Sequence, residues 1–290
     1  MKVAVYGQYY KSEAIEYMHI LFDVLKENNI DFYIEKRFSE LIIADQNTKT
    51  FTHHRDLDSS FDMMLTIGGD GTFLRAVTFV RDLNIPILGI NTGRLGFLAT
   101  VQKEQIKQSI EALINKDYMI KERSLLSVET SLNNNEFDGV NFALNEITIA
   151  RKNTTSMITI ETHLDDEYLT SYWADGLIVS TPTGSTGYSL SCDGPVIMPQ
   201  AKSLVLTPIA PHNLSARPLV IPDDISIKLK VSSREKQALI SLDSRIFTID
   251  NETEILVKKA PFTIKTLQLK NQTFLKTLRE KLLWGEDKRN

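Results

Sequence analysis

The interpretation of the first part of the chain is decided by the stretch Met63-Met64-Leu65-Thr66-Ile67-Gly68-Gly69-Asp70-Gly71-Thr72. Its apolar run is short and does not alternate with polar residues, which is typical of a strand buried on both faces. Gly68 and Gly69 allow backbone angles and close approaches that a side chain would prevent. Thr72 can cap a following helix. The sequence therefore predicts a buried strand, a tight glycine turn and a helix that begins at Thr72.

The predicted turn is suited to binding a phosphate group. Ligands of open α/β sheets bind where the carboxyl ends of strands meet the amino ends of helices. Free N–H groups and the helix dipole favour an anion at that place. The chain nevertheless places its own anion there, Asp70. A carboxylate beside phosphates is repelled unless it accepts a proton or holds a metal ion, and both are tasks of a phosphoryl-transfer site. The alternative is that Gly-Gly-Asp-Gly forms only a turn, with Asp70 as a second helix cap.

Composition limits the class of protein. The 290 residues are enough for two domains, and an apolar share of 42% allows sizeable cores. The net charge of −4 argues against broad nucleic-acid binding, which needs a basic face. Cys192 is the single cysteine, so no internal disulfide can form. The chain shows neither a signal peptide nor an apolar stretch of about 18 residues. We therefore expect a cytoplasmic protein with no nucleic-acid or membrane partner.

Strands and helices alternate in the first part of the chain. Predicted strands cover residues 3–6, 31–35, 63–67 and 85–90, and predicted helices cover residues 12–28, a segment from residue 72, and residues 104–116. Residues 37–57 show no clear pattern. Alternation of this kind predicts a parallel sheet. We therefore expect an α/β domain with a parallel sheet over residues 1–120, which carries Gly-Gly-Asp-Gly-Thr.

The pattern changes after about residue 120. Short predicted strands follow with few helices, at residues 124–132, 139–150, 157–164, 167–173, 177–181, 203–207, 225–231, 238–243, 246–249 and 254–257. Residues 207–218 are predicted to be an ordered loop. Many short strands indicate a mostly antiparallel, β-rich domain, assigned to residues 121–268. An amphipathic helix is predicted at residues 272–283, within a last segment of residues 269–290. That helix can pack back on the first domain or cap the second.

Several common nucleotide and metal motifs are missing from the sequence. There is no Gly-x-x-x-x-Gly-Lys-Ser/Thr, which excludes a P-loop enzyme. Gly69-Asp70-Gly71 is followed by Thr72-Phe73-Leu74, so the Gly-x-Gly-x-x-Gly of dinucleotide-binding folds is incomplete. The five histidines show no zinc-ligand spacing with cysteine.

Two further polar clusters stand in apolar surroundings. Asn145-Glu146 follows an apolar run, and such polar groups need partners in the protein or in a ligand. The second cluster comprises Asp175-Gly176 and the hydroxyl-rich segment from Thr181 to Ser191. Hydroxyls and backbone N–H groups can surround phosphates or ribose, and Tyr188 offers a flat face to a base. The alternatives are a solvated pair at a strand edge and a turn with hydroxyl caps.

These motifs, in this order, resemble the NAD kinase family. The motifs are Gly68-Gly69-Asp70-Gly71-Thr72, Asn145-Glu146, Asp175-Gly176 and Thr181-Pro182-Thr183-Gly184-Ser185-Thr186, and Asp243-Ser244 is similar to the start of the family's Asp-Ser-Gln. Gly-Gly-Asp-Gly-Thr alone is shared with lipid kinases of the diacylglycerol and sphingosine type, and phosphofructokinases carry a similar turn. The Thr-Pro-Thr-Gly-Ser-Thr run with Asn-Glu upstream is much more specific.

The resemblance implies a two-domain NAD kinase-like architecture and an enzyme, an ATP-dependent NAD kinase. It would transfer the γ-phosphoryl group of ATP to the 2′-hydroxyl of the adenosine ribose of NAD, with Asp70 as proton acceptor. The implied NAD-binding residues are Asp70, Gly71, Arg75, Asn145, Glu146, Asp175, Thr186, Gly187, Tyr188, Ser189, Leu190, Ser191 and Ala210. The implied loop for the ATP phosphates consists of Gly68, Gly69, Gly71 and Thr72. Mg²⁺ or another divalent cation would bridge ATP oxygens, with no metal ligand assigned in the chain. A homodimer or homotetramer is also implied.

The chain departs from the family pattern at three positions. Asp193 stands where many members have glycine, Gly187 stands where alanine is usual, and Arg245 replaces the glutamine after Asp243-Ser244. Arg245 would favour an extra phosphate or point to solvent, and it is not assigned to the site. Two other functions stay open at this point: a lipid kinase of the Gly-Gly-Asp-Gly-Thr group, and a non-catalytic dinucleotide-binding regulator.

Overall fold

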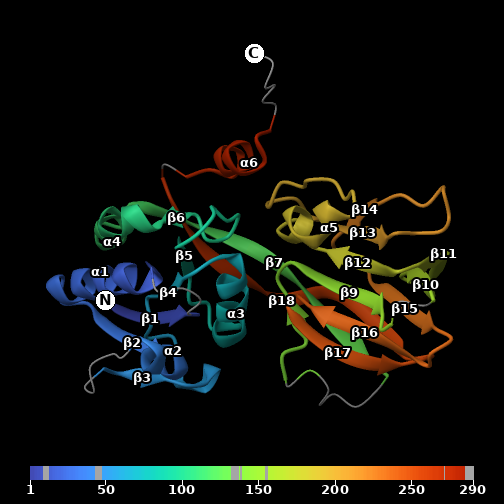
Figure 1. Ribbon diagram of the computed structural model, residues 1–290, viewed down its shortest axis with the longest axis horizontal. Helices are drawn as coiled ribbons and strands as arrows, with labels where there is room; N and C mark the ends of the chain where they lie inside the picture. The colour runs from blue at the N-terminus through green and yellow to red at the C-terminus, as the bar shows by residue number, and fades with distance from the viewer. Residues whose placement is uncertain are drawn as a thin grey trace. The chain divides into compact units, whose positions relative to one another are not determined.

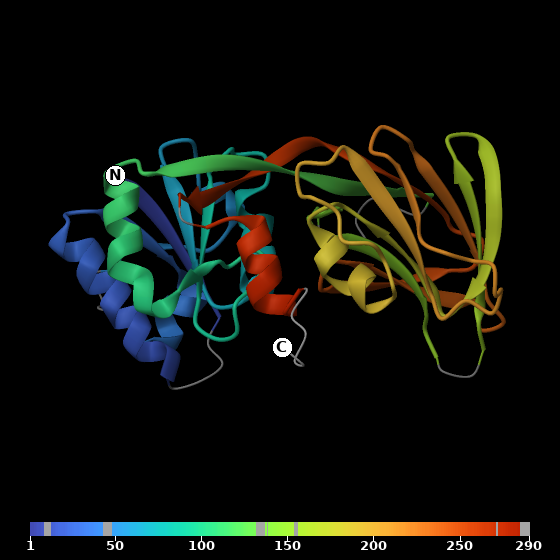
Figure 2. The same cartoon turned by 90° about the horizontal axis from the view of Figure 1, so that it is seen from above.

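The computed structural model describes residues 1–8, 13–42, 48–131, 137, 139–153, 156–270 and 272–284. The chain divides into two compact units (Figures 1 and 2). Unit 1 comprises Met1–Glu122 and Ile264–Asn290, and unit 2 comprises Arg123–Thr263. Two long strands, β7 (Tyr118–Thr130) and β18 (Glu254–Leu269), carry the chain from one unit into the other.

Unit 1 is built on a parallel sheet. Its strands lie in the order β5 (Ile87–Asn91), β4 (Met63–Ile67), β1 (Lys2–Gly7), β2 (Asp31–Glu35) and β3 (Thr50–Phe51), and β6 (Val101–Gln102) pairs with β5. Every pair among them is parallel. All residues of β4 and β5 are buried, as the unalternating apolar runs predict. The predicted α/β domain with a parallel sheet is confirmed.

Helices cover both faces of this sheet. On one face lie α1 (Glu13–Glu27), α2 (Lys36–Leu41) and α4 (Ile106–Ile114), whose apolar side chains share a core with alternate residues of β1, β4 and β5. On the other face lies α3 (Asp70–Val80), where Phe79 packs against Tyr6 of β1 with ring centroids 5.2 Å apart. Period-2 alternation within the strands supplies apolar side chains to both layers. The last helix, α6 (Phe274–Leu282), also belongs to unit 1.

Unit 2 is an antiparallel β-sandwich. One sheet has the order β14 (Leu219–Pro222), β13 (Ser203–Ile209), β12 (Gly176–Ser180), β9 (Glu146–Arg151), β16 (Gln237–Leu242) and β17 (Arg245–Asp250). The facing strands are β11 (Glu167–Ala174), β10 (Ile158–Leu164), β15 (Ile227–Ser232) and β18. Inward aliphatic side chains of both sheets form one core. The short strand β8 (Phe142–Ala143) pairs with β7. The predicted β-rich, mostly antiparallel C-terminal fold is confirmed.

The structure corrects several local predictions. Helix α3 begins at Asp70 with Gly69 as its N-cap, so Thr72 neither begins nor caps it. Thr72 is instead buried, because the glycine turn folds directly over its side chain. Residues 37–57 contain the end of α2, the two-residue β3 and a short 3₁₀ helix at His54–Asp56.

The boundaries in unit 2 also differ from the predictions. Strand β18 extends well beyond the predicted 254–257, and β14 was not anticipated. Pairing with β13 fixes β14, and pairing with β5 at Thr266 and Ile87 holds the later part of β18. A local apolar pattern does not reveal either pairing. The predicted helix start at Ser12 and strand end at Leu132 lie outside the described residues.

In the part of the chain that the structure describes, no helix combines the length and the apolar composition needed to cross a bilayer.

Close packing at Gly7 gives the first testable prediction. A Cβ added to Gly7 would lie within 2.7 Å of three atoms of the Phe38 ring, which is fully buried. Gly7→Ala should therefore lower the free energy of unfolding by about 1–3 kcal/mol through overpacking. Gly93→Ala is the control, because its added Cβ would meet nothing closer than 3.9 Å. Urea denaturation that gives equal midpoints for the two variants would contradict the described packing.

Candidate active site

The glycine turn after β4 has the geometry that its sequence predicts. Gly68 has φ +150°, and a Cβ there would lie 2.9 Å from Cβ of Thr72. Gly69 is an N-cap without a side chain, so no capping group occupies the end of α3. A helix leaves its first N–H groups without intrahelical partners. The turn therefore exposes backbone donors at the positive end of a helix dipole, which favours phosphate.

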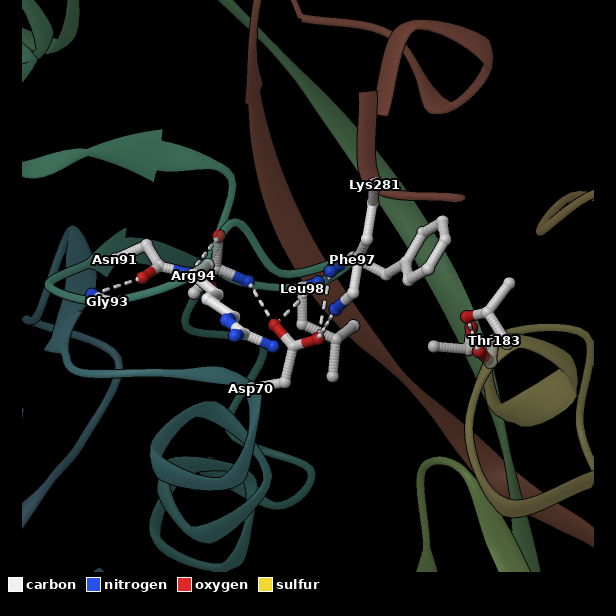
Figure 3. A network of polar contacts seen from close by, with 10 residues as sticks. Asp70, Asn91, Gly93, Arg94, Phe97, Leu98, Thr183 and Lys281 are labelled. Carbon is white, nitrogen blue, oxygen red and sulfur yellow. Dashed lines mark hydrogen bonds and ion pairs between the residues drawn. The ribbon is translucent and has the colours of Figure 1, made fainter. Parts of the chain in front are cut away.

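Asp70 is held by the backbone of the loop that follows β5 (Figure 3). Its Oδ2 accepts a hydrogen bond from the N–H of Phe97 at 2.8 Å. Its Oδ1 accepts from the N–H groups of Leu98 and Ala99 at 3.0 and 2.9 Å. A carboxylate offers about four acceptor positions, so these bonds fill Oδ1 and leave one position on Oδ2. The side chain remains 29% exposed, which keeps Oδ2 open to a ligand.

Asn91 shapes the loop that provides these donors. It is 2% exposed at the end of β5. Its side-chain amide donates to the carbonyl oxygens of Arg94 and Ala99, and its Oδ1 accepts from the N–H of Gly93. Because the buried amide is satisfied three times by the loop, residues 93–99 are fixed against the sheet. The loop of residues 93–99 is thereby held next to the glycine turn that carries Asp70.

Gly96 is the second glycine on which this arrangement depends. A Cβ at residue 96 would fall on Oδ1 of Asp70, far inside van der Waals contact. Either the loop or the carboxylate has to move to admit a side chain.

The substitution Gly96→Ala tests this contact. We expect the displaced carboxylate to lose its N–H donors. The conversion of ATP and NAD to NADP, which is the activity that the family resemblance implies, should fall by about 10²-fold or more. Gly93→Ala in the same loop serves as the control, since its Cβ has room. A folded Gly96→Ala protein with unchanged turnover would show that the carboxylate does not have to occupy this position.

A second cluster lies in unit 2, around a buried carboxylate on the β16–β17 turn. Asp243 accepts hydrogen bonds from the N–H groups of Leu144, Asn145 and Glu146 at 3.0, 2.8 and 3.3 Å. Its own N–H donates to the carbonyl oxygen of Glu146 at 2.9 Å. Asp243 therefore fixes the backbone from which the predicted Asn-Glu pair projects. Burial raises the pKa of Asp243 above its usual range, and the three N–H donors act against that rise.

The Asn145 and Glu146 side chains each hold a buried oxygen without a partner in the described part of the protein. Asn145 Oδ1 and Glu146 Oε2 are buried and have no hydrogen-bond partner among the described residues. Burial, followed by the nearby Asp243 carboxylate, raises the pKa of Glu146 to about 8. Glu146 is therefore mostly protonated at neutral pH and offers an O–H donor as well as an acceptor. A buried polar group without a protein partner can be satisfied by a ligand that enters the site.

The hydroxyl-rich segment packs directly over this pair. Thr181 donates from Oγ1 to the carbonyl oxygen of Leu144 at 2.6 Å and accepts from the N–H of Gly184 at 3.1 Å. A Cβ at Gly184 would lie 2.7 Å from Cα of Asn145, so only glycine allows this approach. A Cβ at Gly187 would lie 3.2 Å from Glu146 Oε2. The structure thus brings the Asn-Glu pair and the segment 181–191 into one cluster.

The remaining predicted residues have more varied surroundings. Asp175 forms an ion pair with Arg151 at 3.0 Å. Tyr188 is 45% exposed. Ser189 is buried, and its hydroxyl is hydrogen-bonded to that of Thr207 at 2.8 Å. Thr186 bonds the carbonyl oxygen of Thr183 at 3.3 Å.

Four predicted residues are more accessible to solvent. Ser191 and Ala210 are exposed and Leu190 is half-buried, and Ala210 has the unusual φ of +43°. In unit 1, Arg75 is exposed one turn after Asp70.

Two departures from the family pattern now have a structural explanation. Asp193 adopts φ +64°, the left-handed conformation that glycine accepts most easily and aspartate tolerates. Arg245 donates hydrogen bonds to the carbonyl oxygens of Val140 and Phe142, so it neither points to solvent nor presents an unpaired charge. It supports the segment that carries the Asn-Glu pair.

The chain supplies no complete metal centre of its own within the described ranges. No group of three or more histidine, cysteine, aspartate or glutamate side chains lies close enough to hold a metal ion there. Asp70 alone offers a carboxylate beside a phosphate-binding turn, and Mg²⁺ is often held by one or two carboxylates together with substrate phosphates. The residues present therefore fit a cation that arrives with a nucleotide.

The raised pKa of Glu146 predicts a pH dependence of stability. The folded protein binds this proton up to about pH 8, whereas the unfolded chain releases it near pH 4.5, the ordinary pKa of a glutamate. The stabilising contribution is therefore complete below about pH 4.5 and is lost as the pH rises through 8. Glu146→Gln should flatten the decline of the melting temperature between pH 6 and pH 9, whereas the exposed Glu167→Gln should not. Parallel curves for all three proteins would show that Glu146 is ionised at neutral pH.

The chain combines a parallel α/β unit, whose glycine turn carries Asp70, with a β-sandwich that carries a hydroxyl-rich loop. This combination is typical of a nucleotide-dependent phosphotransferase. The ATP-NAD kinase N-terminal domain matches residues 3–118, and the ATP-NAD kinase C-terminal domain matches residues 144–269. The chain belongs to the ATP-NAD kinase family.

Individual relatives agree with this assignment. The chain is 58% identical to the NAD kinase of Flavobacterium psychrophilum over 294 residues, with 100% of each chain covered. It is 44% identical to the NAD kinase of Cytophaga hutchinsonii over 295 residues, again with 100% of each covered.

Solved structures of the family share the fold. The yeast NADH kinase complexed with NADH has a TM-score of 0.85 and 25% identity, and covers 99% of this chain and 89% of its own. The Archaeoglobus fulgidus NAD kinase in complex with ATP has a TM-score of 0.76 and 25% identity, with 98% and 99% covered. The predicted NAD kinase family and two-domain fold are confirmed.

Sequence reasoning missed three contributors to these clusters. The N–H groups of Phe97, Leu98 and Ala99 carry no side-chain signal. Asp243 was noticed only as part of a motif and was not assigned to the site. Lys281, near the end of α6, lies 3.7 Å from Oδ2 of Asp70, and nothing in the sequence connects the two residues.

Proposed function

We propose that this protein transfers the γ-phosphoryl group of ATP to the 2′-hydroxyl of the adenosine ribose of NAD, giving NADP and ADP. In this step the bond between O2′ and phosphorus forms, and the bond between phosphorus and the β,γ-bridging oxygen of ATP breaks. The proton of the 2′-hydroxyl leaves as the new bond forms. Membership of the ATP-NAD kinase family and the Asp70 turn support the proposal.

Asp70 is the proton acceptor in this proposal. Its remaining acceptor position lies on Oδ2, since both positions on Oδ1 are filled by Leu98 and Ala99. A carboxylate is a weak base at neutral pH, so it takes the proton late, when the forming bond to phosphorus has made the hydroxyl acidic. Before that, the three N–H donors hold Oδ2 in place, so that it orients the hydroxyl.

The phosphates of ATP are assigned to the glycine turn. Gly68, Gly69, Gly71 and Thr72 surround the amino end of α3, where N–H groups and the helix dipole attract anions. Arg75, which the family resemblance assigns to NAD, is exposed one turn further on and can reach a phosphate of that substrate through a charged, bidentate contact. A divalent cation bound to the ATP phosphates would neutralise their charge during transfer.

The cluster in unit 2 is assigned to NAD. Asn145 Oδ1 and Glu146 Oε2 are buried and have no partner among the described residues, so they are suited to the hydroxyl and amide groups of a dinucleotide. Tyr188 presents an exposed ring for stacking on a base, and Asp175 offers a carboxylate. Gly187 allows close approach to Glu146, and Thr186, Ser189, Leu190, Ser191 and Ala210 complete the assignment. A homo-oligomer remains a prediction from the family resemblance.

The central test is the substitution Asp70→Asn. Purified protein would be incubated with ATP, Mg²⁺ and NAD, and NADP would be read with an NADP-specific dehydrogenase. Asparagine cannot accept the proton, so NADP formation should fall by about 10²–10⁴-fold. Asp82→Asn, which changes an exposed aspartate beyond the far end of α3, should leave the rate unchanged.

Each other outcome changes the proposal. Equal rates for Asp70→Asn and the native protein would keep the kinase and remove Asp70 as its proton acceptor. No NADP from folded native protein, with NAD still bound, would favour the dinucleotide-binding regulator.

A further inference from the structure

The end of α6 places a cation on the Asp70 carboxylate. Lys281 Nζ lies 3.7 Å from Oδ2, which is the oxygen with an acceptor position left (Figure 3). The same ammonium lies 4.9 Å from the ring centroid of Phe97, within the range of a cation–π contact. Lys281 is therefore aimed at the reacting oxygen from an element at the other end of the chain.

This placement is built by a series of contacts along α6. Before the helix, Gln272 and Thr100 exchange two hydrogen bonds, of 2.8 and 2.9 Å. At the first turn, the ring of Phe274 packs against Phe97 with centroids 5.9 Å apart. Thr273 caps the helix by accepting from the N–H of Lys276. The amino end of α6 is thus fastened to residues 97–100, the segment that donates to Asp70.

The separation of 3.7 Å favours a role beyond a static ion pair. It exceeds hydrogen-bonding distance, and the Lys281 side chain is 33% exposed. A partly exposed pair of this kind adds little to stability. The ammonium keeps its donors available, however, and it lies where negative charge increases when phosphates reach the turn.

We propose that Lys281 is a further catalytic residue of the phosphoryl transfer, which rests on the function proposed above. With substrates bound, Lys281 donates to oxygens of the transferring phosphoryl group and stays within Coulomb range of Asp70. It offsets the repulsion between the carboxylate and the phosphates, and it stabilises the charge that spreads over those oxygens during transfer. The C-terminal helix is therefore part of the catalytic apparatus.

The test compares Lys281→Met with Arg279→Met in the NADP assay. Both cations lie in the last turn of α6, so both variants lose the same favourable interaction with the helix dipole. Only Lys281 contacts Asp70 among these two. We expect Lys281→Met to lower kcat by about 10²-fold with the KM for NAD little changed, and Arg279→Met to match the native protein. Lys281→Arg, which keeps the charge, should have a kcat at least tenfold higher than that of Lys281→Met.

Rescue by an added amine separates a catalytic role from a structural one. Ethylammonium should restore activity to Lys281→Ala in a saturable manner and should not affect Arg279→Ala. Thermal unfolding of each variant shows whether it is folded, and a folded Lys281→Met with native kcat overturns the inference. Loss that neither arginine nor ethylammonium recovers also overturns it. If the native protein makes no NADP, the proposed function itself is wrong. If the native protein makes NADP and Lys281→Met has the same kcat, only this inference is wrong.

Discussion

The arrangement of unit 1 depends on one electrostatic constraint, the stabilisation of a carboxylate at a phosphate-binding turn. Asp70 begins α3, where the helix dipole and free N–H groups favour an anion. Three N–H groups of residues 97–99 bond its oxygens, and they can do so because Asn91 fixes the loop and Gly96 has no side chain. The turn after β4 therefore carries the carboxylate, and the loop after β5 supplies the N–H groups that bind it. This arrangement also leaves a single oxygen available for chemistry.

In unit 2 a carboxylate is also held by backbone N–H groups, and there it is removed from solvent. Asp243 is enclosed and satisfied by three N–H groups, and its charge helps to keep Glu146 protonated at neutral pH. The backbone that it fixes holds Asn145 Oδ1 and Glu146 Oε2 in buried positions without protein partners. A buried polar group that lacks a partner lowers the stability of the folded protein. A ligand that bonds these two atoms would therefore stabilise the cluster. The glycines at residues 184 and 187 keep the covering segment close without filling that space.

Local sequence patterns predicted those helices and strands that are determined by residues close together in the sequence. Unalternating apolar runs correctly predicted that β4 and β5 are buried. The apolar face of α1 likewise predicted the side of the helix that packs in the core. The start of α3 was misplaced because Gly69 caps it through backbone geometry, for which a threonine three residues later is a misleading signal. Strand β14 depends on pairing with β13, and the length of β18 depends on pairing with β5, so their local patterns were insufficient.

The sequence by itself determined the class of chemistry. A carboxylate within a glycine turn, an Asn-Glu pair and a hydroxyl-rich loop are chemical signals that survive without coordinates, and together they indicated the family. Only the tertiary structure decided which groups surround them. The N–H donors to Asp70, the anchoring role of Asp243 and the approach of Lys281 each join residues far apart in the chain. Backbone donors carry no side-chain signature, and a lysine on an exposed helix turn looks the same in sequence whether it faces solvent or a reacting carboxylate. Packing, which is non-local, makes that difference.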